Sequence, residues 1–400
     1  MNKQQEPRLR FKGFAGEWKN KTLGDLGRVE MCRRIFKEQT QPSGEIPFFK
    51  IGTFGQEPDA FISRELFEEY RQKYPYPKQG DILISAAGTI GRTVEFTGEN
   101  AYFQDSNIVW LRFDESQITS TFLNITYQNI KWGLEGSTIK RLYNSDLLSA
   151  EITLPSLPEQ IHLGSFFRRL DSQIAESRAV LEKSRQLKKA MLAKMFPANG
   201  EKIPKIRFKG FEGEWECRKL GIEVEIIGGG TPDTTNSAYW NGDIDWYSPT
   251  EIGEAAYANG SVKKITLLGL QKSSAQILPA NRTVLFTSRA SIGDMAILTK
   301  DGSTNQGFQS FVVGERLDVY FFYAMGFKIK DYALKNASGS TFLEISKNTL
   351  SQMEFFVPSL KEQTQIGNFF RQLDETIALQ SAEVEKLNQL KKGLLAAMLV

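Results

Sequence analysis

Hydrophobic residues recur every three or four positions along two stretches of the chain, residues 154–197 and 357–400. In the first stretch they are Leu163, Phe167, Leu170, Ile174 and Leu181. In the second they are Ile366, Phe370, Leu373, Ile377, Val384 and Leu387. This spacing predicts two helices, and a stripe this narrow is typical of a coiled-coil seam. A helix of about 40 residues would span about 60 Å.

The two predicted helices are copies of one another. Pro155-Ser156-Leu157-Pro158-Glu159-Gln160 returns as Pro358-Ser359-Leu360-Lys361-Glu362-Gln363, and more than half of the aligned positions that follow are identical. Each Ser-x-x-Glu predicts a capping box at the helix start. Two related helices in one chain favour an internal antiparallel pair about a pseudo-twofold axis. The alternative is a pair of dimerisation helices with no spacing role.

The stretches at about 20–150 and 217–353 have a different pattern. Short β-prone runs, such as residues 81–85 and 283–287, are bounded by Gly, Asn and Asp and predict strands. Residues 83–91 align with 285–293, and Gly136-Ser137-Thr138 aligns with Gly339-Ser340-Thr341. We therefore expect two diverged copies of one α/β domain.

A second repeated motif precedes each of these stretches. Residues 7–18, with the pattern Phe-x-Gly-Phe-x-Gly-x-Trp, return as residues 204–215. The retained tryptophans indicate aromatic anchors rather than chemistry. The domains predicted from all these patterns are residues 1–153, 154–197, 198–356 and 357–400. The fold class is α+β, with two α/β domains separated by two long helices packed as an antiparallel coiled coil.

Composition narrows the class of protein. The chain has 400 residues, 50 Lys and Arg against 47 Asp and Glu, and a formal net charge of +3. Four hundred residues exceed one ordinary core. Neither an apolar run of about 18 residues nor the apolar core of a signal peptide is present, so we expect a cytoplasmic protein with no membrane partner. Cys32 and Cys217 predict neither a disulfide framework nor a metal site.

Catalytic patterns are missing from the sequence. The only histidine, His162, has Gln365 as its repeat counterpart and is interpreted as an exposed helix residue. Gly228-Gly229-Gly230 lacks the spacing of a phosphate- or dinucleotide-binding loop. The only Glu-x-Lys triplet, Glu17-Trp18-Lys19, loses its lysine in the second copy. No catalytic residue and no metal ligand is therefore predicted.

Several polar groups are of the kinds that contact nucleic acid. Residues 70–78 interleave cations with aromatic rings, and short amides that can bond adenine edges lie beside β-prone runs. The candidates are Arg33, Arg34, Lys37, Arg71, Lys73, Lys78, Gln104 and Asn107, followed by Lys263, Lys264, Arg289, Gln306 and Gln309. Gln104 and Asn107 align with Gln306 and Gln309 at a constant offset. The alternative is that these residues are solvated turns or satisfy turn backbone.

Three features together are typical of one protein family: the duplicated motif at residues 7–18, the duplicated helix starts, and Ser288-Arg289-Ala290-Ser291-Ile292-Gly293. With them the chain resembles specificity subunits of type I restriction–modification systems. The resemblance covers nearly the whole chain. It implies a non-catalytic DNA-recognition subunit, with two target recognition domains and two helical spacers that dock partner subunits. Residues 85–91 lack the arginine at position 289, so a role for Arg289 does not carry over to both domains.

The resemblance also implies partners and cofactors outside this chain. Two modification subunits would bind S-adenosylmethionine and methylate adenine, and restriction subunits would use ATP and Mg²⁺. Each domain would read one half of a bipartite site in double-stranded DNA, and the helices would set the spacer between the halves. Two rival hypotheses remain: a self-contained nuclease or methyltransferase, and a coiled-coil scaffold with two protein-interaction domains that does not bind DNA.

Overall fold

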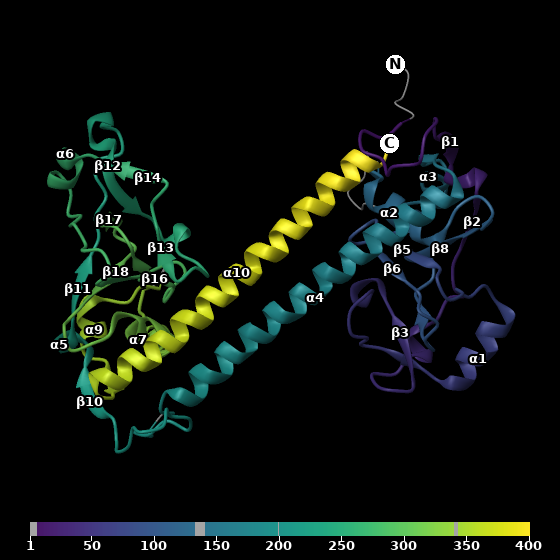
Figure 1. Ribbon diagram of the computed structural model, residues 1–400. Helices are drawn as coiled ribbons and strands as arrows, with labels where there is room; N and C mark the ends of the chain where they lie inside the picture. The colour runs from purple at the N-terminus through teal and green to yellow at the C-terminus, as the bar shows by residue number, and fades with distance from the viewer. Residues whose placement is uncertain (1–5, 133–140, 199, 340–342) are drawn as a thin grey trace. The chain divides into compact units, whose positions relative to one another are not determined.

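The computed structural model describes residues 6–132, 141–198, 200–339 and 343–400. The chain forms two compact units (Figure 1). Unit 1 comprises residues 1–176 and 384–400, and unit 2 comprises residues 177–383. Two long helices, α4 (Leu157–Met195) and α10 (Leu360–Met398), each contribute one part to unit 1 and the other part to unit 2.

Unit 1 is built on a four-stranded sheet in the order β2-β8-β5-β6, with a three-stranded sheet β4-β3-β7 beside it and the antiparallel pair β1-β9. Its strands are β1 (Lys19–Thr22), β2 (Gly27–Glu30), β3 (Ile46–Phe49), β4 (Phe61–Ile62), β5 (Ile82–Ser85), β6 (Thr93–Glu95), β7 (Tyr102–Phe103), β8 (Ile108–Phe113) and β9 (Glu151–Leu154). Its shorter helices are α1 (Arg64–Lys73), α2 (Ser120–Asn129) and α3 (Asn144–Leu148), with 3-10 turns at Leu23–Asp25, Lys37–Gln39 and Ile51–Thr53.

Unit 2 repeats this plan with one additional edge strand, in the order β11-β18-β15-β16-β13, with a second sheet β14-β12-β17 and the pair β10-β19. Its strands are β10 (Glu216–Lys219), β11 (Val224–Gly228), β12 (Trp240–Tyr247), β13 (Tyr257–Ala258), β14 (Lys263–Ile265), β15 (Thr283–Phe286), β16 (Met295–Leu298), β17 (Gly302–Thr304), β18 (Gln309–Val313) and β19 (Glu354–Val357). Its shorter helices are α5 (Leu220–Glu223), α6 (Leu267–Gln271), α7 (Val319–Ala324), α8 (Gly326–Asn336) and α9 (Lys347–Ser351), with 3-10 turns at Ser237–Tyr239 and Pro249–Glu251.

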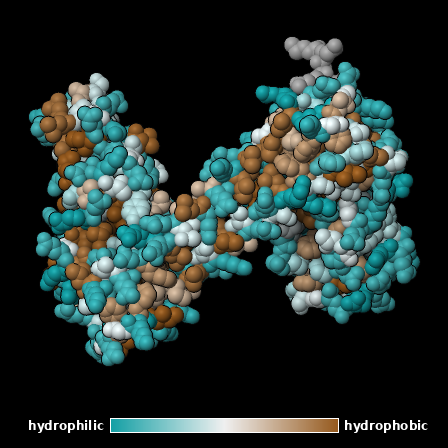
Figure 2. Space-filling model, in the orientation of Figure 1, coloured by the Kyte–Doolittle hydropathy of each residue, from teal (hydrophilic) through white to brown (hydrophobic). Residues whose placement is uncertain are grey.

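The matching strand orders confirm that the two inserts share one fold. The expected α/β character of both domains and the two long helices are also confirmed. Among the described residues, no helix is both long and apolar enough to cross a membrane. The visible surface of the units mixes hydrophilic residues with scattered hydrophobic ones (Figure 2).

The two long helices pack antiparallel within each unit. In unit 1, Lys391 of α10 forms an ion pair with Asp171 of α4 at 2.5 Å, and Met398 at the end of α10 lies in the same core as Leu163 near the start of α4. In unit 2, Lys188 pairs with Asp374 at 2.5 Å. Because Asp374 and Lys391 are the repeat counterparts of Asp171 and Lys188, each unit holds one copy of the same ion pair.

The predicted seam residues have a different role at the two helix starts. Leu163, Phe167, Leu170 and Ile174 are buried in the core of unit 1, together with residues of its sheet and of α2. Ile366 and Phe370 are buried in the core of unit 2 in the same way. Leu181 is buried as well, whereas Leu373, Ile377, Val384 and Leu387 are half-buried. The first turns of each helix are thus part of a domain core, and the narrow-seam prediction was wrong for them.

The duplicated motif before each insert closes onto a helix start. Arg10 donates to both carboxylate oxygens of Glu159 at 2.7 and 2.8 Å, and Arg207 repeats this contact with Glu362 at the same distances. The glutamate hydrogen bond raises the pKa of each guanidinium, and Glu159 and Glu362 are buried. The predicted capping boxes are therefore wrong in their carboxylate half, and the serine half is recorded for the second helix alone. Ser359 Oγ accepts from the Glu362 amide at 3.4 Å, but both carboxylates bind arginine rather than the helix backbone.

The retained tryptophans anchor the same motif. Trp18 and Trp215 are each 2% exposed and pack edge-on or tilted against Phe122 and Phe321, at centroid distances of 6.1 and 5.8 Å. This confirms the prediction that the tryptophans are structural anchors.

A glycine at the equivalent position of α4 and α10 lets each insert approach its helix closely. A Cβ at Gly164 would lie 2.2 Å from Thr121 Oγ1, and one at Gly367 would lie 2.4 Å from Asp318 Oδ1. Both contacts are far below van der Waals separation, so these two repeated glycines fix how α4 and α10 contact the N-terminal ends of α2 and α7. Gly393 differs, since a Cβ there would meet nothing within 4 Å.

We predict opposite effects for two glycine substitutions in unit 1. Gly164→Ala should lower the free energy of unfolding of this unit by about 1–3 kcal/mol because α2 must shift. Gly393→Ala, the matched control, should raise it by about 0.5–1 kcal/mol through helix propensity alone. Urea unfolding followed by circular dichroism measures both, and equal effects would contradict the close-packing argument.

Candidate nucleic-acid interface

A turn retained in both units marks one end of the core sheet. We define the retained turn as residues 85–92 after β5 and residues 287–294 after β15. The buried hydroxyl of Thr287 donates to the carbonyl of Ser291 at 2.5 Å and accepts from the amide of Asp294 at 2.9 Å. Ser85 makes the same two bonds at the same distances, to Thr89 and Arg92.

The backbone of the retained turn is also the same in both units. Gly88 has a φ of 64° and its counterpart Ala290 has a φ of 61°. A left-handed conformation is uncommon for alanine and costs energy, and such strain clusters at functional sites. The tips of both turns are exposed, although the residues that lead into them are buried. The turn thus presents backbone and a hydroxyl-bearing residue, Thr89 or Ser291, to solvent.

Two neighbouring segments complete this end of the sheet. In unit 1, the amide of Ala86 donates to the carbonyl of Asn107, and the amide of Leu142 donates to the carbonyl of Ala86, both at 2.8 Å. In unit 2, Ser288 bonds Gly307 at 2.8 Å and Ile345 bonds Ser288 at 3.0 Å. Each unit therefore brings three segments together around its retained turn.

Two of the sequence candidates lie here in unit 1. Gln104 and Asn107 flank Ser106, a residue with a φ of 55°. Gln104 Oε1 accepts from the amide of Ile51 at 2.9 Å, so its carbonyl end is already used in holding the turn region together. Arg34 reaches the same segment through an ion pair with Asp105 at 3.3 Å.

In unit 2 the retained turn gathers Arg289, Gln306 and Gln309. Gln306 is exposed and bonds the hydroxyl of Thr231, and Arg289 pairs with Glu344 at 2.9 Å. The Oε1 atom of Gln309 is buried and has no partner among the described residues. Three of the five candidates in this unit are thus brought together.

The expected alignment of amides between the halves was wrong. Because the Ser288 amide bonds Gly307 where the Ala86 amide bonds Asn107, Gly307 is the counterpart of Asn107. Gln309 then takes the position of Val109, a core residue, and Gln306 that of Ser106. The polar groups around the two turns are consequently different.

The glycine run before this site has a packing reason. A Cβ at Gly229 would lie 2.0 Å from the carbonyl oxygen of Asn305, and one at Gly230 would lie 2.4 Å from the amide nitrogen of Ala275. Trp246 Nε1 donates to the carbonyl of Gly230 at 2.8 Å. The run is a tightly packed loop, which supports the interpretation that it is not a phosphate cradle.

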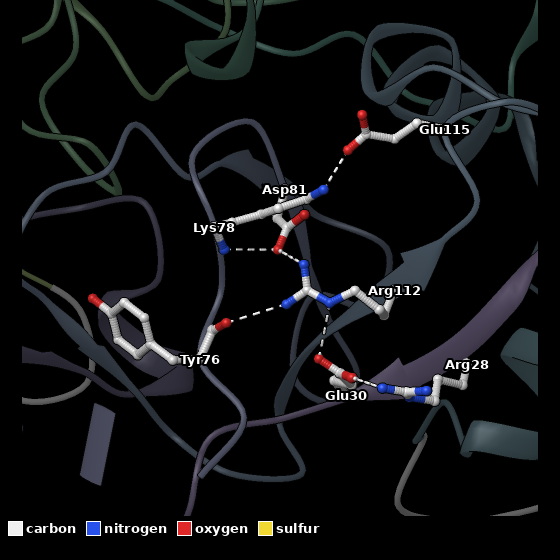
Figure 3. Close-up of polar contacts among 7 residues, drawn as sticks. All are labelled: Arg28, Glu30, Tyr76, Lys78, Asp81, Arg112 and Glu115. Carbon is white, nitrogen blue, oxygen red and sulfur yellow. Dashed lines mark hydrogen bonds and ion pairs between the residues drawn. The ribbon is translucent and has the colours of Figure 1, made fainter. Parts of the chain in front are cut away.

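The cation-rich segment 70–78 lies at the other end of β5. Figure 3 shows Arg112 between Asp81, Glu30 and the carbonyl of Tyr76, at 3.0 to 3.1 Å. Lys78 bonds Glu115 at the edge of this network. Burial raises the pKa of Asp81, while the Lys78 amide and the Arg112 guanidinium act to lower it. The carboxylate of Glu115 therefore balances the charge of Lys78.

The remaining candidates are dispersed. Lys73 pairs with Glu69 within α1, and Arg71 lies over the rings of Phe67 and Tyr76. Arg33 lies 5.2 Å from the Tyr74 ring, and Lys37 is an exposed residue of a 3-10 turn. On β14, Lys263 lies 5.9 Å from the Trp240 ring and Lys264 pairs with Asp245 at 3.3 Å. These residues do not join the retained turns.

One residue that sequence reasoning missed lies at the turn of unit 1. Arg141 forms an isolated antiparallel bridge with Ala87, and its guanidinium donates to the carbonyl of Ser106 at 3.0 Å. The only available signal was that Arg141 aligns with Glu344, a change of charge sign between the halves. The repeated Gly-Ser-Thr motif precedes this bridge in both halves but lies outside the described residues, except for Gly339.

The described residues contain no group of three or more His, Cys, Asp or Glu side chains that could hold a metal ion. His162 is exposed, with its ring 5.2 Å from that of Phe14, as expected for a helix-surface residue. Neither finding points to a reaction centre, and the retained turns remain the strongest candidate sites.

The chain is similar to known proteins, and the family match falls once in each half of the chain. A family model described as the type I restriction modification DNA specificity domain matches residues 15–183 and 212–389. A putative type I restriction enzyme specificity subunit of Haemophilus influenzae is 58% identical over 158 residues, 38% of this chain and 41% of that protein. The type I restriction enzyme MjaIX specificity subunit of Methanocaldococcus jannaschii is 33% identical over 193 residues, 47% of this chain and 43% of that protein. The chain thus matches these two relatives over about two fifths of their length.

Solved structures show the same fold over the whole chain. The crystal structure of a type I restriction–modification S subunit from M. genitalium matches with a TM-score of 0.65 and 17% identity, covering 99% of both chains. A chain from a structure that describes complex assembly and conformational transition of a type I system matches with a TM-score of 0.51, over 94% of this chain and 96% of that one.

We predict that the buried hydroxyl of the retained turn is required for its shape. Thr287→Val should lower the free energy of unfolding of unit 2 by about 1–3 kcal/mol, because the Ser291 carbonyl and Asp294 amide lose their partner. Thr287→Ser, which copies the unit 1 residue, should keep both bonds. Hydrogen exchange at the Asp294 amide should quicken in the valine variant alone, and equal exchange in both variants would disprove the role.

Proposed function

Because the chain belongs to the type I restriction modification DNA specificity family, we propose that it is the DNA specificity subunit of a type I restriction–modification complex. The observation that carries the proposal is the contrast inside the molecule. Two units share a sheet order and a retained turn, yet they differ in the polar side chains around that turn. One geometry with two sets of polar groups suits a protein that reads two different half-sites.

We propose residues 1–153 and 198–356 as the two target recognition domains. Around each retained turn, the groups that could contact base edges are side chains. Asn107 and Ser106 are available in unit 1, and Gln306 with Thr231 in unit 2. Amide side chains can bond adenine edges in the major groove bidentately, whereas backbone contacts carry no sequence information. Because these groups do not match between the units, the recognised site should be bipartite and asymmetric.

The segments 154–197 and 357–400 would act as the spacer between the two half-sites. A helix of 39 residues, the length of both α4 and α10, spans about 58 Å at 1.5 Å per residue. B-DNA repeats about every 34–36 Å, so helices of this length suit readers about one turn or more apart. The ion pairs Asp171–Lys391 and Lys188–Asp374 would support the packing of the two helices, while the helix length would set the spacer.

The partners would be double-stranded DNA, two modification subunits and restriction subunits in the cytoplasm. S-adenosylmethionine, ATP and Mg²⁺ would be bound by those subunits rather than by this chain. The nearly balanced charge of +3 supports such a division, because DNA affinity is dominated by phosphate neutralisation. Partner subunits would supply many of the phosphate contacts. The chain itself would be non-catalytic.

A scaffold with two protein-interaction domains is the alternative function. It is disfavoured by the family match over residues 15–183 and 212–389, whose description is a DNA specificity domain.

We predict that exchanging residues 20–150 for the insert of another family member changes one half of the recognised site only. The second half and the spacer should be unchanged, because unit 2 and both helices are retained. Sequencing of methylated adenines after co-expression with the modification subunits measures this. A changed spacer with both halves intact would contradict the assignment of domains, and unchanged methylation would contradict DNA recognition.

We also predict that the helices set the spacer length. Deleting about seven residues, or two helical turns, between residues 175 and 190 should change the spacer or abolish binding, because α4 becomes about 10 Å shorter. The control is Lys188→Met, which breaks the ion pair with Asp374 without shortening the helix and should leave the spacer unchanged. The same methylation sequencing decides, and an unaltered spacer with full affinity after the deletion would exclude the ruler role.

A further inference from the structure

We propose that each retained turn grips the DNA backbone through one arginine, Arg141 in unit 1 and Arg289 in unit 2, independently of base sequence. This inference rests on the proposed function and assigns the contact that both units share. It also distinguishes that contact from the base-reading residues, which differ between the units. Arg141 and Arg289 lie on opposite strands of equivalent bridges, so sequence alignment does not pair them.

The geometry of the bridge supports this pairing. Ala87 bridges Arg141 in unit 1, and Arg289 bridges Glu344 in unit 2, both antiparallel. Ala87 aligns with Arg289, and Arg141 aligns with Glu344. Side chains of residues paired across an antiparallel bridge project to the same side with their Cβ atoms about 4.5–5.5 Å apart. Both units therefore carry one guanidinium on the same side of the same bridge, next to the exposed turn tip.

The surroundings of the two arginines suit a phosphate more than a base. The turn tips beside them, Gly88-Thr89 and Ala290-Ser291, expose backbone and a hydroxyl, which are donors that contact phosphate oxygens in protein–DNA complexes. The turn backbone is the same in both units, whereas a base-reading loop should differ between unlike half-sites. A contact retained in both units is thus best assigned to the part of DNA that does not vary.

The charge around the arginine differs between the units. Arg141 donates to an uncharged acceptor, the carbonyl oxygen of Ser106. Arg289 instead pairs with Glu344, and both side chains of that pair are about 40% exposed, at 39% and 40%. Arg289 Nε is buried and has no partner among the described residues, so the guanidinium has unused donor capacity. Glu344 would be released, or stay as a repulsive neighbour, when a phosphate binds.

The test measures the affinity of the full chain, in complex with its modification subunits, at several salt concentrations. Two duplexes are used: one with the site mapped by adenine methylation and one with both half-sites scrambled. Arg141→Gln and Arg289→Gln should each weaken binding to both duplexes by a similar factor. Each should also reduce the slope of log K against log salt by about 0.9, the value for one lost phosphate contact.

Three further variants separate a backbone contact from a structural role. Arg289→Lys and Arg141→Lys should restore most of the salt slope, because they keep the charge. Glu344→Gln should strengthen binding to both duplexes several-fold, since it removes a negative charge beside the phosphate. Arg64→Gln, which breaks an exposed ion pair between Arg64 of α1 and Glu45, is the matched control and should change neither affinity nor slope.

The outcomes distinguish this inference from the proposed function. If the unaltered complex prefers the mapped duplex but Arg289→Gln leaves the salt slope unchanged, the backbone contact is disproved while DNA recognition stands. Loss of binding to the mapped duplex alone would make Arg289 a base-reading residue and would also overturn the inference. If the unaltered complex does not prefer the mapped duplex, the proposed function fails and the inference fails with it.

Discussion

The bidentate pairs Arg10–Glu159 and Arg207–Glu362 fix the geometry on which the rest of each unit depends. Glu159 and Glu362 are each 1% exposed, and a buried carboxylate without a partner would be strongly unfavourable. Each arginine also donates to a carbonyl of its own loop, so it ties the segment before the insert to the start of a long helix. The strand that follows, β1 or β10, then pairs with the strand that leads back into the helix, in the same register in both units.

Besides the side chains of the long helices that lie in the cores, one glutamine of each helix binds backbone atoms of its insert. Gln160 Oε1 accepts from the Thr119 amide, and Gln160 Nε2 donates to the Gln117 carbonyl. Gln363 repeats both bonds with the Asp318 amide and the Arg316 carbonyl. Because backbone groups are the same for every residue type, the inserts can change side chains without losing these contacts. The structure therefore explains how the frame remains similar while the inserts diverge.

The sequence was sufficient for the features that depend on period and repetition. It predicted both long helices, their antiparallel pairing, the shared insert fold and the tryptophan anchors. It could not show that Leu163, Phe167 and Ile366 enter domain cores, since the same spacing serves a seam or a core face. Nor could it show that Glu159 binds an arginine 149 positions away. At the candidate site, the misaligned amides and the missed Arg141 share one cause: the offset between halves changes where a loop gains or loses residues.

The bridge beside the retained turn affects how substitutions in related chains should be compared. One arginine occupies it in each unit, but on opposite strands, and the facing residue is Ala87 or Glu344. Two arginines would place like charges across a single bridge, which is destabilising. Substitutions at these two positions should consequently be correlated among relatives: the loss of arginine on one strand accompanies its gain on the other. The conserved feature would be one arginine at each bridge, on either strand, which a comparison of single alignment columns would not detect.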